Sequence, residues 1–170
     1  MKKKTTFRSL KVNFSDIPRE GMELTYYLDE DWFKAIAPQG MRFTRQARAD
    51  VFLEPSASEV NINGSISGEV ELTCIRCLKT FPFSLVPKFS LSMVPEEVHH
   101  PREKGLKREQ LDIDVYQKGV VDIEGVLVDQ IMLNLPDYPR CKKDCKGLCP
   151  QCGADLNTEQ CDCLKKEGGR

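Results

Sequence analysis

The end of this chain carries a dense group of cysteines. Of the eight cysteines in the 170-residue sequence, six lie in the last thirty residues. They are Cys141, Cys145, Cys149, Cys152, Cys161 and Cys163. Their neighbours are mostly Lys, Asp, Gly and Gln, and a segment this short and polar cannot bury a useful core. Covalent or coordinative bonds must therefore hold it.

The spacing of the last four cysteines predicts a zinc site. Cys149-Pro-Gln-Cys152-Gly has the form of a metal-binding knuckle, in which backbone N–H groups turn toward the sulfurs. A tetrahedral Zn²⁺ takes four thiolates at about 2.3 Å, and Cys161-Asp-Cys163 can supply the second pair. A redox Cys-x-x-Cys pair normally starts a helix, whereas Pro150 and Gly153 favour a turn. The most economical ligand set is Cys149, Cys152, Cys161 and Cys163.

The other four cysteines leave several alternatives open. Cys141 and Cys145 can replace one pair, join a two-metal cluster or remain free. They can also meet Cys74-Ile-Arg-Cys77, which would give two four-thiolate sites. Spacing alone does not choose among these. For Cys74 and Cys77 the sequence narrowly favours a simpler interpretation, a pair of small, partly buried thiols at a hairpin end.

Composition and charge restrict the partners and the compartment. The net charge is −1, so nucleic-acid binding has to come from local patches. The start Met-Lys-Lys-Lys is followed by polar and charged residues instead of the apolar stretch of a signal peptide. No segment reaches the roughly 20 apolar residues of a membrane span. We expect a cytoplasmic protein without a membrane partner, where clustered cysteines more often bind metal than form disulfides.

Hydrophobic periodicity predicts an α+β domain over residues 1–136 and a cysteine-rich tail over 137–170. A short helix is expected at 29–37, before Pro38. Alternating apolar residues predict antiparallel strands, with Cys74–Cys77 at the tip of a long hairpin. These strands are expected at 41–53, 60–72 and 81–93.

The rest of this domain is expected to hold a loop, a strand and a second helix. Residues 95–110 are rich in charge and predict the loop, and 111–116 predict the strand. Asp122 is a suitable N-cap for the helix, which Pro136 ends. The apolar stripe of this helix is Ile123, Val126, Leu127 and Ile131.

Basic residues offer a route to RNA. Lys2, Lys3 and Lys4 belong to an acid-free N-terminal arm, while Arg42 and Arg48 share one strand face. Arg45 interrupts the apolar face of that strand, where an arginine needs an anion or a buried partner. Lysines beside the tail cysteines suit phosphate contacts, or they offset the charge of −2 on a four-thiolate zinc. The RNA-binding candidates are Arg42, Arg45, Arg48, Lys2, Lys3 and Lys4.

Signatures of catalysis are missing from the sequence. It has no Ser–His–Asp or Cys–His arrangement, no phosphate-binding glycine loop and no paired carboxylates in a readable motif. We expect a protein that is not an enzyme and has no small-molecule substrate.

Three cysteine segments resemble the YceD family of large ribosomal RNA subunit accumulation proteins. They are Leu72-Thr-Cys-Ile-Arg-Cys-Leu78, Cys145-Lys-Gly-Leu-Cys-Pro-Gln-Cys-Gly-Ala-Asp-Leu-Asn157 and Cys161-Asp-Cys163. Ile17-Pro-Arg-Glu-Gly21 extends the resemblance over nearly the whole chain. It implies a bacterial or plastid protein needed for accumulation of 23S rRNA, through precursor processing or large-subunit assembly. The implied partners are large-subunit rRNA or a pre-ribosomal particle, with ribosomal proteins or assembly factors.

Two functions therefore compete. The first is a ribosome-assembly factor that binds rRNA or a precursor particle, with zinc as a structural staple. The second is a zinc-stapled adaptor that docks another protein without direct RNA contact. Salt separates them, because phosphate binding weakens steeply as salt rises. A third hypothesis, a thiol oxidoreductase, is separated by whether the protein carries zinc or reducible disulfides.

Overall fold

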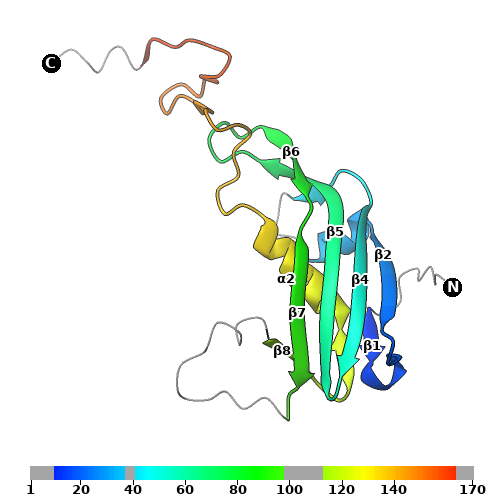
Figure 1. Cartoon of the computed structure of the whole chain (residues 1–170). Helices are drawn as coiled ribbons and strands as arrows, with labels where there is room; N and C mark the ends of the chain where they lie inside the picture. Colours follow the sequence, from blue (N-terminus) through cyan, green and yellow to red (C-terminus); the bar gives the residue numbers. More distant parts are fainter. Residues whose placement is uncertain (1–9, 37–40, 98–112, 164–170) are drawn as a thin grey trace, which may run out of the picture.

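The computed structural model describes residues 10–36, 41–97 and 113–163 (Figure 1). Most of the elements are strands, and two are α-helices. In chain order they are β1 (Lys11–Asn13), the 3-10 helix η1 (Phe14–Asp16), β2 (Met22–Leu28), α1 (Glu30–Ile36), β3 (Arg42–Phe43), β4 (Ala47–Ser56), β5 (Glu59–Thr73), β6 (Thr80–Leu85), β7 (Lys88–Pro95), β8 (Ile113–Tyr116), β9 (Val120–Asp122) and α2 (Ile123–Asn134). Neither helix has the length and apolarity needed to span a membrane, within the described ranges.

A seven-stranded sheet forms the body. Its main order is β2-β4-β5-β7-β8, while β3 and β6 pair with the far half of β5. All of these pairs are antiparallel except β7–β8, which is parallel. Strands β1 and β9 form a separate two-stranded sheet. The predicted α+β class with an antiparallel sheet and few helices is confirmed, and the parallel edge pair is an addition to it.

Helix α2 lies against one face of this sheet (Figure 1). The Asp122 side chain accepts a hydrogen bond from the Gly125 N–H at 3.2 Å, which caps the helix as predicted. Its buried residues are the predicted stripe, Ile123, Val126, Leu127 and Ile131. They share one core with the inward residues of β2, β4 and β5. Burying each such side chain contributes about 1.5–3 kcal/mol.

Helix α1 is the other predicted helix that the structure confirms. The Asp29 carboxylate accepts a hydrogen bond from the Trp32 N–H at 2.9 Å, and Phe33 is fully buried. The Phe33 ring lies 4.1 Å from the Phe43 ring, centroid to centroid. The Trp32 indole N–H donates to Glu124 of α2 at 2.9 Å. These contacts attach α1 to both the sheet and α2.

Strand β5 reaches well beyond the helix-covered core. Its 15 residues span about 50 Å and pair first with β7 and then with β6. The predicted strand at 81–93 is interrupted at Val86 and Pro87, because proline has no N–H for the ladder. The pairs Ser65–Lys88 and Gly68–Leu85 keep one register across the gap. The hairpin therefore continues without a slip to its tip at residues 74–79.

The structure corrects the expectation for Arg45. Phe43 pairs with Val70 and Arg48 with Ser67, so five steps along one strand oppose three along β5. The two extra residues bulge between β3 and β4, and Arg45 is exposed there. It does not lie on an apolar strand face and requires no buried partner. Period-two counting failed only at Arg45, because a bulge of two residues takes Arg45 off the ladder and leaves the alternation in phase, with Phe43 and Ala47 both buried.

Candidate metal centres

The turn at the end of the β5–β6 hairpin brings two thiols together. The Cys74 N–H donates to the Lys79 carbonyl and the Leu78 N–H to the Cys74 carbonyl, both at 2.9 Å. Leu78 takes the left-handed conformation, with φ +57°, which closes the turn. Cys74 and Cys77 are both buried.

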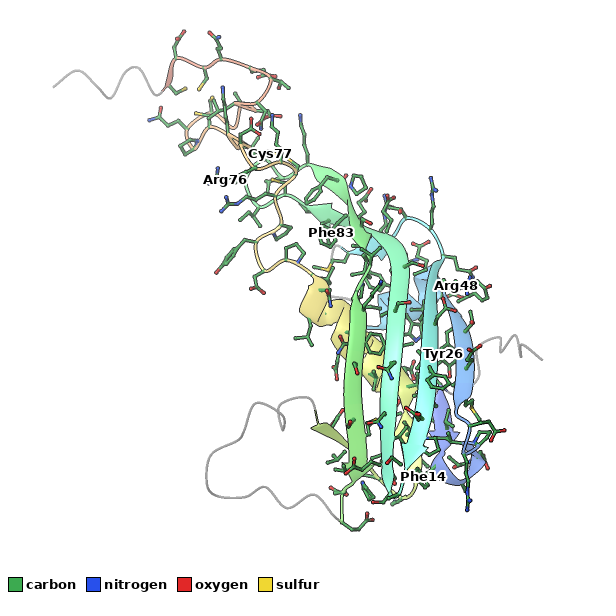
Figure 2. All side chains as sticks on the ribbon, viewed as in Figure 1. Phe14, Tyr26, Arg48, Arg76, Cys77 and Phe83 are labelled. Carbon is green, nitrogen blue, oxygen red and sulfur yellow. The ribbon has the colours of Figure 1, made fainter. Side chains whose placement is uncertain are left out.

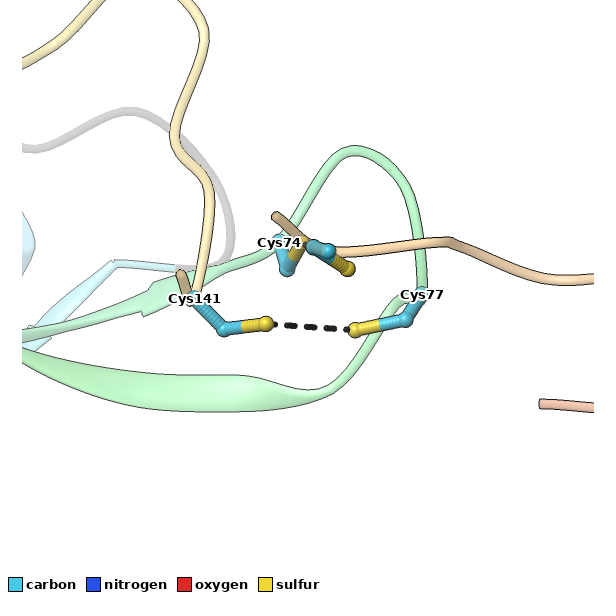
Figure 3. A group of neighbouring side chains, drawn as sticks. Cys74, Cys77 and Cys141 are labelled. Carbon is cyan, nitrogen blue, oxygen red and sulfur yellow. Dashed lines mark hydrogen bonds between the residues drawn. The ribbon is translucent and has the colours of Figure 1, made fainter. Parts of the chain in front are cut away.

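The chain that follows α2 returns to this turn. The Ile75 N–H donates to the Pro139 carbonyl at 2.9 Å, and the Leu148 N–H donates to the Arg76 carbonyl at 3.0 Å. The Arg76 guanidinium donates to the Cys145 carbonyl at 2.8 Å. These bonds place Cys141 and Cys145 against the hairpin thiols. Figure 3 shows Cys141 beside Cys77. We call Cys74, Cys77, Cys141 and Cys145 the hairpin-tip site.

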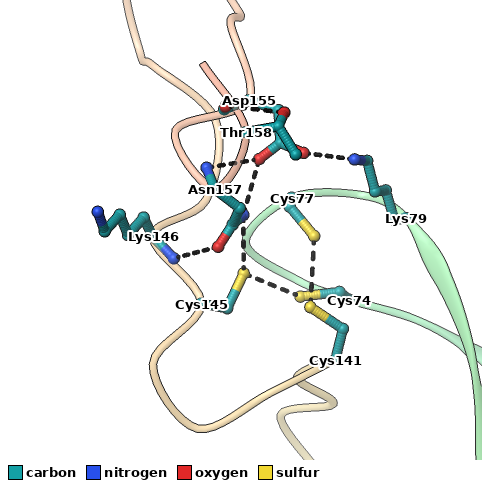
Figure 4. Close-up of polar contacts among 9 residues, drawn as sticks. All are labelled: Cys74, Cys77, Lys79, Cys141, Cys145, Lys146, Asp155, Asn157 and Thr158. Atoms are coloured by element: carbon teal, nitrogen blue, oxygen red, sulfur yellow. Dashed lines mark hydrogen bonds and ion pairs between the residues drawn. The ribbon is translucent and has the colours of Figure 1, made fainter. Parts of the chain in front are cut away.

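Sulfur spacing at the hairpin-tip site fits a tetrahedral metal. The Cys74–Cys145 sulfurs lie 3.8 Å apart and the Cys77–Cys141 sulfurs 3.6 Å apart (Figure 4). Metal–sulfur bonds of about 2.3 Å in a tetrahedron put the sulfurs about 3.8 Å apart, whereas a disulfide needs about 2.05 Å. All four sulfurs lie within 4.8 Å of one another. The geometry favours the two-site alternative over the simpler interpretation of Cys74 and Cys77.

The four cysteines selected from spacing also lie together. The sulfurs of Cys149, Cys152, Cys161 and Cys163 are within 4.8 Å of one another, and we call this group the tail site. Its knuckle is closed by the Gly153 N–H, which donates to the Cys149 carbonyl at 2.9 Å. Gly153 has φ +74°, which suits glycine because it lacks a Cβ. All eight cysteines are free thiols.

A polar junction connects the two sites. The Asn157 side chain donates to the Cys145 sulfur at 3.5 Å and accepts from the Lys146 N–H at 3.0 Å. Lys79 of the hairpin forms an ion pair with Asp155 at 2.5 Å (Figure 4). The Lys79 ammonium and then the Asn157 N–H groups lower the pKa of Asp155 to about 2. The tail site is thereby fixed to the hairpin-tip site.

Backbone N–H groups favour a thiolate in each group. Burial disfavours the Cys74 thiolate, but hydrogen bonds from the backbone of Cys141, Cys77 and Arg76 outweigh it and lower the pKa of Cys74 to about 6. Hydrogen bonds from the backbone of Cys152 and Gln151 lower the pKa of Cys149 to about 7.

Other thiols in the same two groups hold their protons more tightly. Burial and hydrogen bonding to neighbouring thiols raise the pKa of Cys141 to about 12. The pKa of Cys163 is raised to about 12, first by a hydrogen bond with Cys152 and second by burial. Close sulfurs cannot all ionise alone, so a bound cation has to displace these protons. The residues fit such a cation.

The basic candidates lie apart from the thiols. Arg42 forms an ion pair with Glu71 at 2.8 Å, and Arg48 one with Asp50 at 2.7 Å. Figure 2 shows Arg48 on the sheet body, well away from Cys77. Lys2, Lys3 and Lys4 fall outside the described residues. Sequence reasoning did not assign Arg76 or Asn157, the residues that hold the loops. Arg76 adjoins Cys77 in the sequence, but Asn157 lies four residues from its nearest cysteine, Cys161.

The chain resembles known sequences. The model of the family "Large ribosomal RNA subunit accumulation protein YceD" matches residues 62–169, a range that includes all eight cysteines. An uncharacterized protein of Mycobacterium tuberculosis is 26% identical over 110 residues, which cover 65% of this chain and 51% of that protein.

Two plant relatives carry descriptive names. The chloroplastic YCED homolog 1 of Arabidopsis thaliana, named a large ribosomal RNA subunit accumulation protein, is 28% identical over 131 residues, 64% of this chain and 41% of that protein. The maize protein of the same name is 26% identical over 128 residues, 61% and 44% respectively. The chain spans about half the length of these curated relatives or less. No solved structure matches it. By the family match, the chain belongs to the YceD family of large ribosomal RNA subunit accumulation proteins.

Proposed function

We propose that this protein is a cytoplasmic ribosome-biogenesis factor that supports the accumulation of 23S rRNA. In this proposal it associates with large-subunit rRNA or with an assembling particle, and it acts by binding instead of by catalysis. The observation that carries the proposal is the family match over residues 62–169. The names of the chloroplastic relatives of Arabidopsis and maize support the same role.

The proposal includes two structural zinc ions for each chain. Four thiolates with tetrahedral spacing are the ligand set of structural zinc, whereas catalytic zinc keeps one position open for water. Sulfur distances of 3.6 and 3.8 Å at the hairpin-tip site support metal over a disulfide exchanger. The hairpin-tip site would attach the tail to the sheet, and the tail site would order residues 149–163. Zinc supplies cross-linking and no reaction step.

The ligand sets can be tested by elemental analysis of purified protein. The natural chain should hold two zinc ions, and Cys152→Ser should lose the one at the tail site. A disulfide-bonded, metal-free protein would contradict the zinc assignment.

The role in ribosome assembly can be tested by affinity recovery of the tagged chain from bacteria. Large-subunit rRNA should be enriched over small-subunit rRNA, and depletion should lower the ratio of 23S to 16S rRNA. A double variant, Cys77→Ser with Cys152→Ser, should lose this enrichment of large-subunit rRNA. Its free-thiol content and its expression level are measured as controls. Equal recovery of both rRNAs with the natural chain would refute the proposal.

A protein adaptor is the second candidate, and one observation favours it. Ile75 and Leu78 of the hairpin tip are 48% and 64% exposed, next to the hairpin-tip site. Apolar side chains on a rigid turn suit a protein partner. If recovery of large-subunit proteins survives digestion of the RNA and is lost in Ile75→Ser with Leu78→Ser, the adaptor is favoured. Loss on digestion favours direct RNA binding.

A further inference from the structure

A groove of about 360 Å³ lies between β6 and the segment that leads from α2 to the hairpin-tip site. Its volume falls within the range of about 300–1,000 Å³ typical of ligand pockets. We call it the aromatic groove, after three of its lining residues. The six residues used below are Phe81, Phe83, Tyr138, Arg140, Lys142 and Lys143.

The aromatic side chains come from two parts of the chain. Phe81 and Phe83 alternate on β6, opposite Leu72 and Val70 of β5. Both phenylalanines are half-buried, and Phe81 packs against the main core as well as the thiols of the hairpin-tip site. Tyr138 is 72% exposed. Figure 2 shows Phe83 on the hairpin between Cys77 and the sheet body. The groove therefore combines two supported rings with one open ring.

The cationic side chains of the groove are available to an anionic partner. Arg140, Lys142 and Lys143 are exposed, and none of them forms an ion pair with any described residue. By contrast, Arg42 and Arg48 are already engaged on the sheet. Residues 136–146 hold four basic and two acidic residues, so this stretch keeps a positive excess before the thiolates are counted. An anionic partner fits this surface.

Together these features match single-stranded nucleic acid. Bases stack on aromatic rings, whatever their sequence, while Lys and Arg follow the phosphates. We propose that the aromatic groove binds a single-stranded segment of RNA, with a base on Tyr138 and phosphates near Arg140, Lys142 and Lys143. This inference rests on the proposed role in rRNA accumulation and names where and how RNA is held. A duplex offers no unstacked base to these rings.

A competing role for the lysines is charge compensation. A metal held by four thiolates carries a charge of −2, and Lys142 and Lys143 directly follow Cys141 of the hairpin-tip site. In that case their removal would weaken metal binding and leave RNA binding unchanged. Tyr138 has no part in charge compensation, so its variants separate the two roles.

The experiment uses the full, metal-loaded chain and fluorescent 12-nucleotide RNAs of random sequence, with a hairpin duplex for comparison. Tyr138→Leu removes the π face and keeps apolar bulk, and it should weaken single-strand binding roughly 5- to 150-fold. Tyr138→Phe keeps the ring and should remain close to the natural affinity. Every variant is checked for two equivalents of metal.

Charge is tested by the salt dependence of binding. Lys142→Gln with Lys143→Gln should reduce the slope of log affinity against log salt by about 0.7 for each lost contact. Lys118→Gln removes one positive charge from the turn between β8 and β9, at the end of the molecule away from the tail, and should leave both the affinity and the slope unchanged (Figure 1).

Several results would overturn the inference. They are no single-strand binding by the natural chain, equal losses with Tyr138→Leu and Tyr138→Phe, or lysine variants that alter only metal affinity. In cells, recovery of large-subunit rRNA that is unaffected by Tyr138→Leu would reject the groove and leave the proposed function standing. No recovery by the natural chain would reject the function itself. Recovery of proteins that resists RNA digestion and is lost in Tyr138→Leu would assign the groove to a protein partner.

Discussion

Replacing Gly147 by alanine should weaken metal binding at the hairpin-tip site. Gly147 has φ +79°, and a Cβ placed there would lie 2.9 Å from the Arg76 carbonyl oxygen and 3.3 Å from the Arg76 Cβ. That carbonyl accepts the hydrogen bond from Leu148 that holds the tail on the hairpin. The backbone therefore cannot retreat without loosening the loop that carries Cys145.

The size of the effect follows from two contributions. Alanine in the left-handed region costs about 1–2 kcal/mol, and overpacking against fixed atoms costs about 1–3 kcal/mol. Their total of roughly 2–5 kcal/mol corresponds to a roughly 30- to 4,000-fold loss of affinity. Gly153 of the tail site is a matched control, because it has φ +74° but nothing within 4 Å of the added Cβ. Gly153→Ala should incur only the cost of the left-handed conformation, which lowers metal affinity at the tail site roughly 5- to 30-fold.

Competition with a coloured chelator, with cobalt as an absorbing substitute for zinc, measures both affinities. Cys152→Ser removes the tail site, so that the affinity of the hairpin-tip site is measured alone. Cys77→Ser removes the hairpin-tip site, so that the affinity of the tail site is measured alone. Natural affinity in Gly147→Ala, or equal losses for the two glycine variants, would refute the role of the close approach to Arg76.

Three further outcomes are expected. Cys77→Ser should lower the metal content from two to one and expose residues after 137 to protease, and an unchanged digestion pattern would contradict the attachment of the tail to the hairpin. Asp122→Ala removes the cap of α2 and should lower the free energy of unfolding in urea by about 1 kcal/mol, while Asp122→Asn should lose little. Metal affinity at the hairpin-tip site should rise with pH, because Cys141, with a pKa of about 12, must lose its proton at any pH from 5 to 8. The rise should be steeper below pH 6, where Cys74 also binds a proton, and chelator competition that shows one slope through pH 6 would count against this.

Local patterns carried most of what the sequence predicted. Helix α2 follows from its cap, its 3.6-residue stripe and Pro136, all within fifteen residues. The thiols of the tail site gather within another fifteen, from Cys149 to Cys163, so their spacing was informative. The α+β body likewise follows from alternation along single strands.

Contacts distant in sequence account for what the sequence left open. Cys77 and Cys141 are 64 residues apart, and they meet only because Ile75 and Arg76 bond the returning chain. No spacing rule contains that information. The bulge at Arg45 is a smaller case, since two added residues leave the alternation in phase and so leave no trace of the bulge in the pattern. The aromatic groove also combines residues of β6 with residues that follow α2.

The separation of the thiols at the hairpin-tip site has a consequence for the whole body of the protein. A cross-link between positions 64 residues apart removes loop entropy from the unfolded chain, worth about 4 kcal/mol by the relation used for disulfides. The enclosed loop contains β6, β7, β8, β9 and α2. Removal of the metal from the hairpin-tip site, at one end of the sheet, should therefore lower the melting temperature of the whole sheet, although most of the sheet contributes no metal ligand. Availability of metal would then set the stability of the whole folded body and not only the order of the tail.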